Sequence, residues 1–161
     1  AIHGRTRSQG YRGEADWEII NDCAQSSGVP IIGNGDITSA EILKYRKETT
    51  AISGVMIGRA AMQNPWIFSE AKCFLKDGKL PSRPSIAQRW SFVIRHCRLA
   101  VESDRYGEEK HTLMAMRSRL MTYCKGFPGA KPLRQQLSQV SSIADVEEIA
   151  ARSENLREEY R

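Results

Sequence analysis

The feature that most constrains the fold is a pair of short apolar runs that each end in glycine. The first, over residues 30–37, reads Pro-Ile-Ile-Gly-Asn-Gly-Asp-Ile, and the second, over residues 54–59, reads Gly-Val-Met-Ile-Gly-Arg. A glycine at the end of a strand can adopt a positive φ and lets a ligand approach the backbone closely. We therefore expect each run to form a strand whose following turn lies beside a ligand.

A helix is expected after each of these glycine turns. Thr38 and Glu41 have capping-box spacing after the first run, and Gly58 with Arg59 leads directly into the second helix. Amides at a helix N-terminus attract anions, and an adjacent arginine favours a phosphate. The pattern thus predicts a phosphate site formed by the amides of Gly35 and Gly58 with the Arg59 side chain. The same glycines are also compatible with plain tight turns in an open α/β sheet.

Consecutive strand-glycine-helix units are typical of the last repeats of a (β/α)8 TIM barrel, where phosphate sites follow strands seven and eight. Helical periodicity after Glu14, a strand over residues 52–57 and a helix from Asn64 to about Gly78 give residues 1–80 the order β-α-β-α-β-α. We expect the C-terminal part of such a barrel, with about three parallel strands and their helices. The chain begins without methionine, in what reads as a strand end, so we expect a fragment entered midway through the barrel.

No further strand is expected after residue 80, and residues 81–161 read as an all-helical domain. Ser85 and Gln88 have capping-box spacing at the start of a helix whose apolar stripe includes Trp90 and Cys97. Further helices are expected at about 108–124, 130–137 and 143–152. The three tryptophans, Trp17, Trp66 and Trp90, have helical spacing within apolar stripes and are expected in the core.

Composition excludes several other classes of protein. No apolar run approaches the roughly 20 residues of a membrane helix, and no signal peptide is visible, so we expect a cytoplasmic protein with no membrane partner. The four cysteines form no C-x-x-C pair, which argues against a zinc site or a disulfide framework. No metal site is expected.

Positive charge is concentrated in the second half of the chain. Residues 83–134 contain eleven Lys and Arg against four Asp and Glu, whereas residues 1–80 contain ten against nine. Such an excess is compatible with a solvated surface or with a surface that binds nucleic-acid phosphates. Arg5 and Arg7, on the loop after the first strand, allow the same two interpretations.

Several motifs together resemble one enzyme family. They are His3-Gly4-Arg5-Thr6-Arg7, Gly33-Asn34-Gly35-Asp36-Ile37, Gly58-Arg59-Ala60, Asn64-Pro65-Trp66 with Phe68, and Phe127-Pro128-Gly129-Ala130. In order and spacing they resemble the tRNA-dihydrouridine synthases, most closely the bacterial-type B subgroup. The resemblance covers nearly the whole chain.

The resemblance implies a barrel that holds FMN at its C-terminal face and a helical domain that helps to bind tRNA. The family reduces uridine to 5,6-dihydrouridine: reduced FMN gives a hydride to C6, a cysteine supplies the proton to C5, and NADPH reduces the flavin again. It implies that His3 lies near the isoalloxazine ring. The residues implied at the FMN phosphate and ribityl chain are Asn34, Gly35, Asp36, Gly58 and Arg59. The residues expected to bind RNA are Arg5, Arg7, Arg117, Arg119, Lys125, Lys131 and Arg134.

The chain departs from the family pattern in one respect. The catalytic cysteine and a flavin-contacting lysine of the family lie upstream of any segment like His3-Gly4-Arg5. We therefore assign no catalytic residue, and we expect the chain alone to be inactive. We also expect it to self-associate or to need the missing part of the barrel.

Two other functions remain open on the residues alone. One is a flavin-free, phosphate-binding TIM-barrel enzyme of a biosynthetic pathway, and the other is a non-catalytic RNA-binding module. The basic helical region argues against the first, and the paired glycine loops argue against the second. His3 is also compatible with an ordinary loop histidine, and Asp36 with a turn residue that begins a helix.

Overall fold

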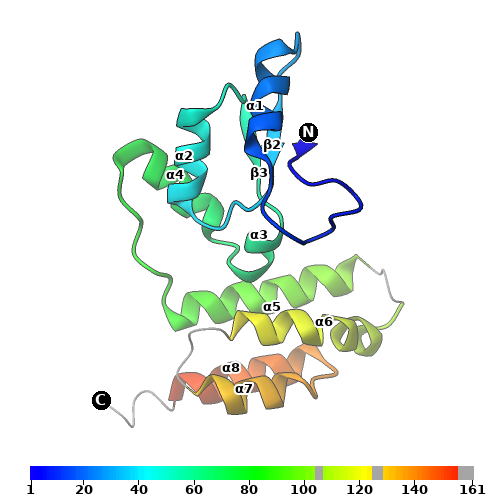
Figure 1. Cartoon of the computed structure of the whole chain (residues 1–161). Coiled ribbons are helices and arrows are strands. Elements are labelled where there is room, and N and C mark those ends of the chain that lie inside the picture. The colour runs from blue at the N-terminus through cyan, green and yellow to red at the C-terminus, as the bar shows by residue number, and fades with distance from the viewer. Residues whose placement is uncertain (104–106, 125–128, 156–161) are drawn as a thin grey trace. The chain divides into compact units, whose positions relative to one another are not determined.

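The structure is a computed structural model, and it describes residues 1–103, 107–124 and 129–155. The chain forms two compact units, Ala1–Ser82 and Arg83–Arg161. The first contains a small parallel sheet with helices, and the described residues of the second form helices only (Figure 1). The predicted combination of a parallel sheet and a mostly helical chain is confirmed.

Three short parallel strands form the sheet of the first unit. They are β1 (Ile2–His3), β2 (Ile32–Asn34) and β3 (Gly54–Met56), in the spatial order β1-β2-β3. His3 pairs with Asn34, and Asn34 pairs with Met56, so the three strands end level with one another. The carboxyl ends of all three strands therefore lie along one edge of the sheet.

Two helices join these strands, since parallel pairing needs a crossover connection: α1 (Trp17–Ser26) between β1 and β2, and α2 (Ala40–Thr49) between β2 and β3. Two more helices, α3 (Arg59–Gln63) and α4 (Ile67–Asp77), follow β3. Trp17 packs its ring on Gly33 of β2, where a Cβ would lie only 2.7 Å from the ring. Figure 1 shows α2 and α4 side by side, and the two helices are in contact. The buried core of the unit comprises Ala15, Trp17, Ile20, Ile37, Ala40, Leu43, Ile52 and Ala71.

Two predicted helix starts are wrong by one to three residues. The cap of α2 is Ser39, whose hydroxyl accepts a bond from the amide of Ile42 at 3.3 Å, and not Thr38. The sequence predicts a helix from Asn64, but α4 begins at Ile67. Asn64 instead accepts a bond from the amide of Trp66 and donates to the carboxylate of Glu70, so it stabilises the turn that precedes α4.

The described helices of the second unit agree closely with the periodicity of the sequence. They are α5 (Ile86–Glu102), α6 (Glu109–Tyr123), α7 (Ala130–Leu137) and α8 (Ile143–Asn155). The predicted capping box is confirmed: the Ser85 hydroxyl accepts from the amide of Gln88 at 3.2 Å, and the Gln88 side chain accepts from the amide of Ser85 at 2.8 Å. Two satisfied amides fix the start of α5.

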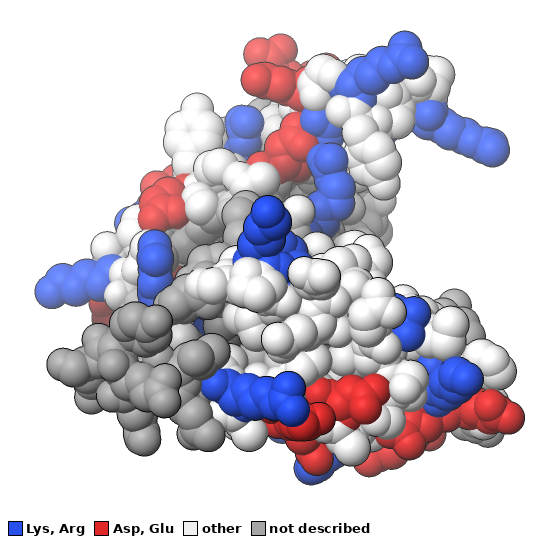
Figure 2. All heavy atoms as spheres, turned by 90° about the horizontal axis from the view of Figure 1, so that it is seen from below, with Lys and Arg blue, Asp and Glu red and all other residues white. Residues whose placement is uncertain are grey.

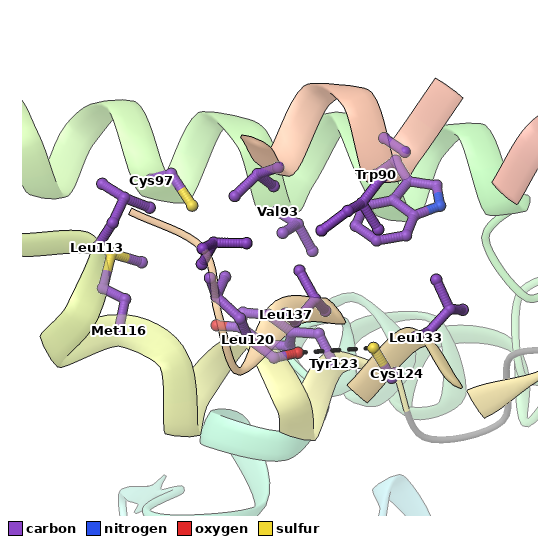
Figure 3. Packing of buried hydrophobic residues seen from close by; sticks show 14 residues of the cluster. Trp90, Val93, Cys97, Leu113, Met116, Leu120, Tyr123, Cys124, Leu133 and Leu137 are labelled. Atoms are coloured by element: carbon purple, nitrogen blue, oxygen red, sulfur yellow. Dashed lines mark hydrogen bonds between the residues drawn. The ribbon is translucent and has the colours of Figure 1, made fainter. Parts of the chain in front are cut away.

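Aliphatic and aromatic side chains from all four helices fill the core of this unit (Figure 3). Leu113 and Leu120 of α6 are completely buried. Cys97 and Cys124 are buried as well, and burial raises the pKa of each thiol to about 11. These two cysteines therefore act as small apolar side chains. Trp17 and Trp90 are likewise buried, whereas Trp66 is only half-buried.

Two kinds of feature are absent from the described ranges. None of the helices there combines the length and the apolar character needed to cross a membrane. Nowhere in the same ranges do three or more His, Cys, Asp or Glu side chains gather closely enough to hold a metal ion.

Candidate functional site

The residues predicted to bind a phosphate ligand gather at the carboxyl edge of the sheet. The side-chain amide of Asn34, at the end of β2, lies 3.3 Å from the sulfur of Met56, at the end of β3. In parallel α/β sheets this edge is where ligands bind. The predicted residues that lie in these strand ends or in the turns that follow them are His3, Asn34, Gly35, Asp36 and Gly58, and Arg59 is the first residue of α3.

Asp36 is the centre of this arrangement. Its carboxylate accepts two bonds from Arg5, at 2.7 and 2.8 Å, and one from the amide of Ala15 at 2.8 Å. Arg59 donates to it at 3.2 Å. The bonds from Arg5 are the main reason why the pKa of Asp36 lies below its ordinary value; partial burial acts in the opposite direction, and the Ala15 amide and both arginine charges add to the lowering. The chain's own donors therefore occupy the Asp36 side chain.

Arg5 holds the loop after β1 and does not face solvent. Its side chain is only 5% exposed, and besides Asp36 it binds the carbonyl oxygens of Arg12 at 3.3 Å and Gly13 at 2.6 Å. These contacts argue against the prediction that Arg5 binds RNA. The guanidinium forms a bidentate pair with a carboxylate and also donates to two loop carbonyl oxygens. It is therefore inaccessible to an RNA phosphate. Arg7 lies on the exposed part of the same loop.

The ring of His3 is oriented by the adjoining backbone. Its Nδ1 accepts a bond from the amide of Arg5 at 2.9 Å. Because an accepting nitrogen carries no hydrogen, the neutral ring has its proton on Nε2. The side chain is exposed at the strand end, so Nε2–H is the group that His3 can offer to a ligand.

The predicted phosphate site includes two glycines, Gly35 and Gly58, and the structure accounts for them differently. Gly35 has φ +138°, and a Cβ built there would lie 2.4 Å from the Cβ of Ala15. Gly58 has φ −97°, so it does not use the positive φ that a glycine allows. No described atom lies within 4 Å of a Cβ built at Gly58. The space beside Gly58 is therefore open to a ligand, whereas Gly35 is required by packing.

Arg59 is the accessible positive group of the site. It is the first residue of α3, and its side chain is 53% exposed. Its guanidinium carbon lies 4.5 Å from the centre of the Tyr11 ring. Since α3 has only five residues, its dipole is small, and the guanidinium supplies most of the positive charge. An exposed arginine beside an open glycine suits a phosphate.

Sequence reasoning missed Tyr11. The residue lies in a polar loop, and nothing in its local spacing distinguishes it from a solvated tyrosine. Its contact with Arg59 joins two segments that are far apart in the sequence. Only the fold brings them together.

The predicted RNA-binding residues of the second unit differ in accessibility. Arg117 donates to the carbonyl oxygens of Val140 at 2.9 Å and Gln139 at 3.1 Å, so two of its three nitrogens link α6 to the segment before α8. Lys131 and Arg134 are exposed on α7 and are better placed for RNA. Lys125 lies outside the described residues, as do Phe127 and Pro128 of the Phe127-Pro128-Gly129-Ala130 motif.

Arg119 lies close to a histidine and a tyrosine in the same unit. The Nδ1 of His96 and the hydroxyl of Tyr123 are 3.0 Å apart. Burial is the main cause that lowers the pKa of His96, and the charge of Arg119 adds to it. Arg119 is half-buried, so only part of its side chain is accessible to RNA.

Exposed charges on the protein are of both signs. Figure 2 shows Lys and Arg interspersed with Asp and Glu on the face turned toward the viewer. Within the second unit, Arg98 pairs with Glu147 at 2.7 Å, and Arg152 pairs with Glu148. Acidic side chains therefore pair with part of the basic excess of the second unit.

Comparison with known proteins gave consistent matches. Residues 1–160 match the family model described as dihydrouridine synthase. A probable tRNA-dihydrouridine synthase 1 of Synechocystis is 35% identical over 148 residues, which are 92% of this chain and 41% of that protein. A probable tRNA-dihydrouridine synthase of Rickettsia conorii is 35% identical over 150 residues, 93% of this chain and 44% of that protein. The tRNA-dihydrouridine synthase B of Pseudomonas aeruginosa is 36% identical over 160 residues, 96% of this chain and 47% of that protein. The chain thus spans less than half the length of these relatives.

Proposed function

Because this chain belongs to the dihydrouridine synthase family, we propose that the full-length protein reduces uridine in tRNA to 5,6-dihydrouridine, with FMN as cofactor and NADPH as reductant. The observation that carries the proposal is the family match over residues 1–160. The names of the relatives support tRNA as the substrate. In this proposal the strands and helices of the first unit form the C-terminal part of a (β/α)8 barrel, and the second unit contacts tRNA.

The residues at the carboxyl edge of the sheet fit a flavin nucleotide. Arg59 is half-exposed beside the open face of Gly58, which suits the phosphate. Asn34 and the backbone of Gly35 and Asp36 are suited to the ribityl chain, and Nε2–H of His3 is suited to a polar atom of the isoalloxazine ring. When bound, FMN supplies the hydride. The described side chains bind and orient the cofactor.

A flavin measurement on the full-length protein tests the proposal. We expect the purified protein to show flavin absorbance or to take up added FMN, and to form dihydrouridine in tRNA when NADPH is supplied. A protein that contains no flavin and binds none would contradict the flavin function. In that case a flavin-free phosphate-binding enzyme or an RNA-binding module would remain.

Replacing Arg59 with alanine is expected to weaken FMN binding by about tenfold to a hundredfold. A charge-assisted hydrogen bond contributes about 1.5–3 kcal/mol, and about 1.4 kcal/mol corresponds to a factor of ten in affinity. The dissociation constant is measured by quenching of FMN fluorescence in the full-length protein. Lys47→Ala removes one positive charge from the exposed end of α2 and serves as control. Equal FMN affinity in the Arg59→Ala variant and the wild type would exclude Arg59 from the site.

Salt dependence tests the RNA surface of the second unit. Lys131→Ala combined with Arg134→Ala is expected to weaken tRNA binding and to reduce the log-log salt slope by roughly 0.7–0.9 for each phosphate that the variant no longer binds. The expected weakening is similar for RNAs of different sequence, since phosphate contacts carry no sequence information. Arg98→Ala is the control because Arg98 already pairs with Glu147. The same slope in the double variant and in the wild type would mean that Lys131 and Arg134 face only water.

A further inference from the structure

We propose that Tyr11 is a positioning residue that, together with Asp36, holds the guanidinium of Arg59 in place for the phosphate of a flavin nucleotide. The inference rests on the proposed FMN function and extends it to a residue on a different loop. Tyr11 would act through Arg59, without touching the cofactor itself.

Two contacts of different kinds hold Arg59. The face of the Tyr11 ring lies 4.5 Å from the guanidinium carbon, and a carboxylate oxygen of Asp36 lies 3.2 Å from Nη2. A guanidinium carries five N–H donors. The bond to Asp36 uses one donor and the ring contact uses none, so neither contact competes with a phosphate for the remaining donors.

Asp36 can orient Arg59 without cancelling its charge. The carboxylate already forms a bidentate pair with buried Arg5, at 2.7 and 2.8 Å, and its bond to Arg59 is longer, at 3.2 Å. Two arginines thus share one carboxylate, and the group keeps a net positive charge. A phosphate that approaches Arg59 therefore meets an attractive field and does not have to displace a fully matched ion pair.

Tyr11 supplies the restraint that Asp36 alone lacks. Arg59 is a long side chain that is 53% exposed, and such a side chain loses conformational entropy when it binds a ligand. Stacking against a ring restricts the guanidinium before the ligand arrives. A cation–π contact at an exposed site corresponds to about a two- to fivefold change in an equilibrium constant. Tyr11 is itself 77% exposed, so its packing on other residues is slight and the contact with Arg59 is its main described interaction.

The test compares two flavins that differ only in the phosphate. In the full-length protein, Tyr11→Leu is expected to weaken FMN binding about two- to fivefold and to leave riboflavin binding unchanged, because riboflavin has no phosphate for Arg59 to bind. Tyr11→Phe is expected to bind FMN like the wild type, since the ring face is kept. In a variant that already carries Arg59→Ala, Tyr11→Leu is expected to have no further effect on FMN binding.

Several outcomes would overturn the inference. Equal losses of affinity for FMN and riboflavin would mean that Tyr11 acts on the flavin ring or on the fold. A Tyr11→Phe variant that binds FMN as weakly as Tyr11→Leu would exclude the ring contact. Flavin binding that is unaffected by Tyr11→Leu would overturn this inference alone. A wild-type protein that binds neither flavin would overturn the proposed function and this inference together.

Discussion

Replacing Gly35 with alanine is expected to lower the free energy of unfolding of the full-length protein by about 2–6 kcal/mol. Two costs add together: a non-glycine residue at φ +138° is strained, by about 1–3 kcal/mol, and its Cβ would lie 2.4 Å from the Cβ of Ala15, where overpacking costs about 1–3 kcal/mol. Because Gly35 also accepts a bond from the indole of Trp17 at 3.1 Å, a displaced loop would weaken that contact as well. The midpoint of urea unfolding, followed by tryptophan fluorescence, measures the change.

Two other glycines separate these costs. Gly10 has φ +54° with no described atom within 4 Å of a built Cβ, so Gly10→Ala reports the backbone cost alone, about 1–2 kcal/mol. Gly28 has neither a positive φ nor a described neighbour at that distance, and Gly28→Ala is expected to be nearly neutral. A Gly35→Ala variant as stable as Gly10→Ala would show that Ala15 moves aside without cost.

Replacing Leu120 with alanine is expected to destabilise the helical unit by about 2–5 kcal/mol. Leu120 is completely buried and packs among side chains of the other helices (Figure 3), so truncation removes apolar contacts and leaves a cavity. Urea unfolding of the full-length protein, followed by circular dichroism at the helical band, measures the change.

Leu99 provides the matched control for this variant. It lies on α5 but is 52% exposed, so Leu99→Ala is expected to change stability by less than about 0.5 kcal/mol. Similar effects of the two substitutions would contradict the assignment of Leu120 to the core.

Features that depend on local sequence could be predicted well. The helices of the second unit follow from apolar periodicity, and α7 spans the predicted residues 130–137. The cap of α5 follows from a serine and a glutamine three residues apart. The motifs also predict the family, which the family model confirms. Each of these signals lies within a short stretch of chain, where spacing alone decides the outcome.

The wrong helix starts show how local spacing fails. Thr38 and Ser39 are adjacent hydroxyl residues, and either can cap a helix according to its type. Which of the two residues caps α2 depends on the direction in which the chain leaves β2, and that direction cannot be inferred from residue spacing. Asn64 is similar, because its side chain caps a turn that precedes the helix.

The internal geometry of the candidate site could not be predicted, because it depends on contacts between distant loops. Arg5 and Asp36 are 31 positions apart, and no spacing rule pairs them. The basic sequence around Arg5 predicts RNA binding, whereas the fold places the carboxylate of Asp36 directly against the Arg5 side chain. Tyr11 reaches Arg59 in the same way. A count of charges along the chain includes every arginine, but it does not distinguish those that pair with groups of the protein from those that are available to a ligand.

The strand order of the sheet has a consequence for synthesis on the ribosome. Ile2 pairs with Gly33, and Ile32 pairs with Gly54, so each strand joins the edge left by the strand made before it. No described strand has to wait for a later one or insert between two earlier ones. The nascent chain can therefore extend this sheet strand by strand in the order of translation.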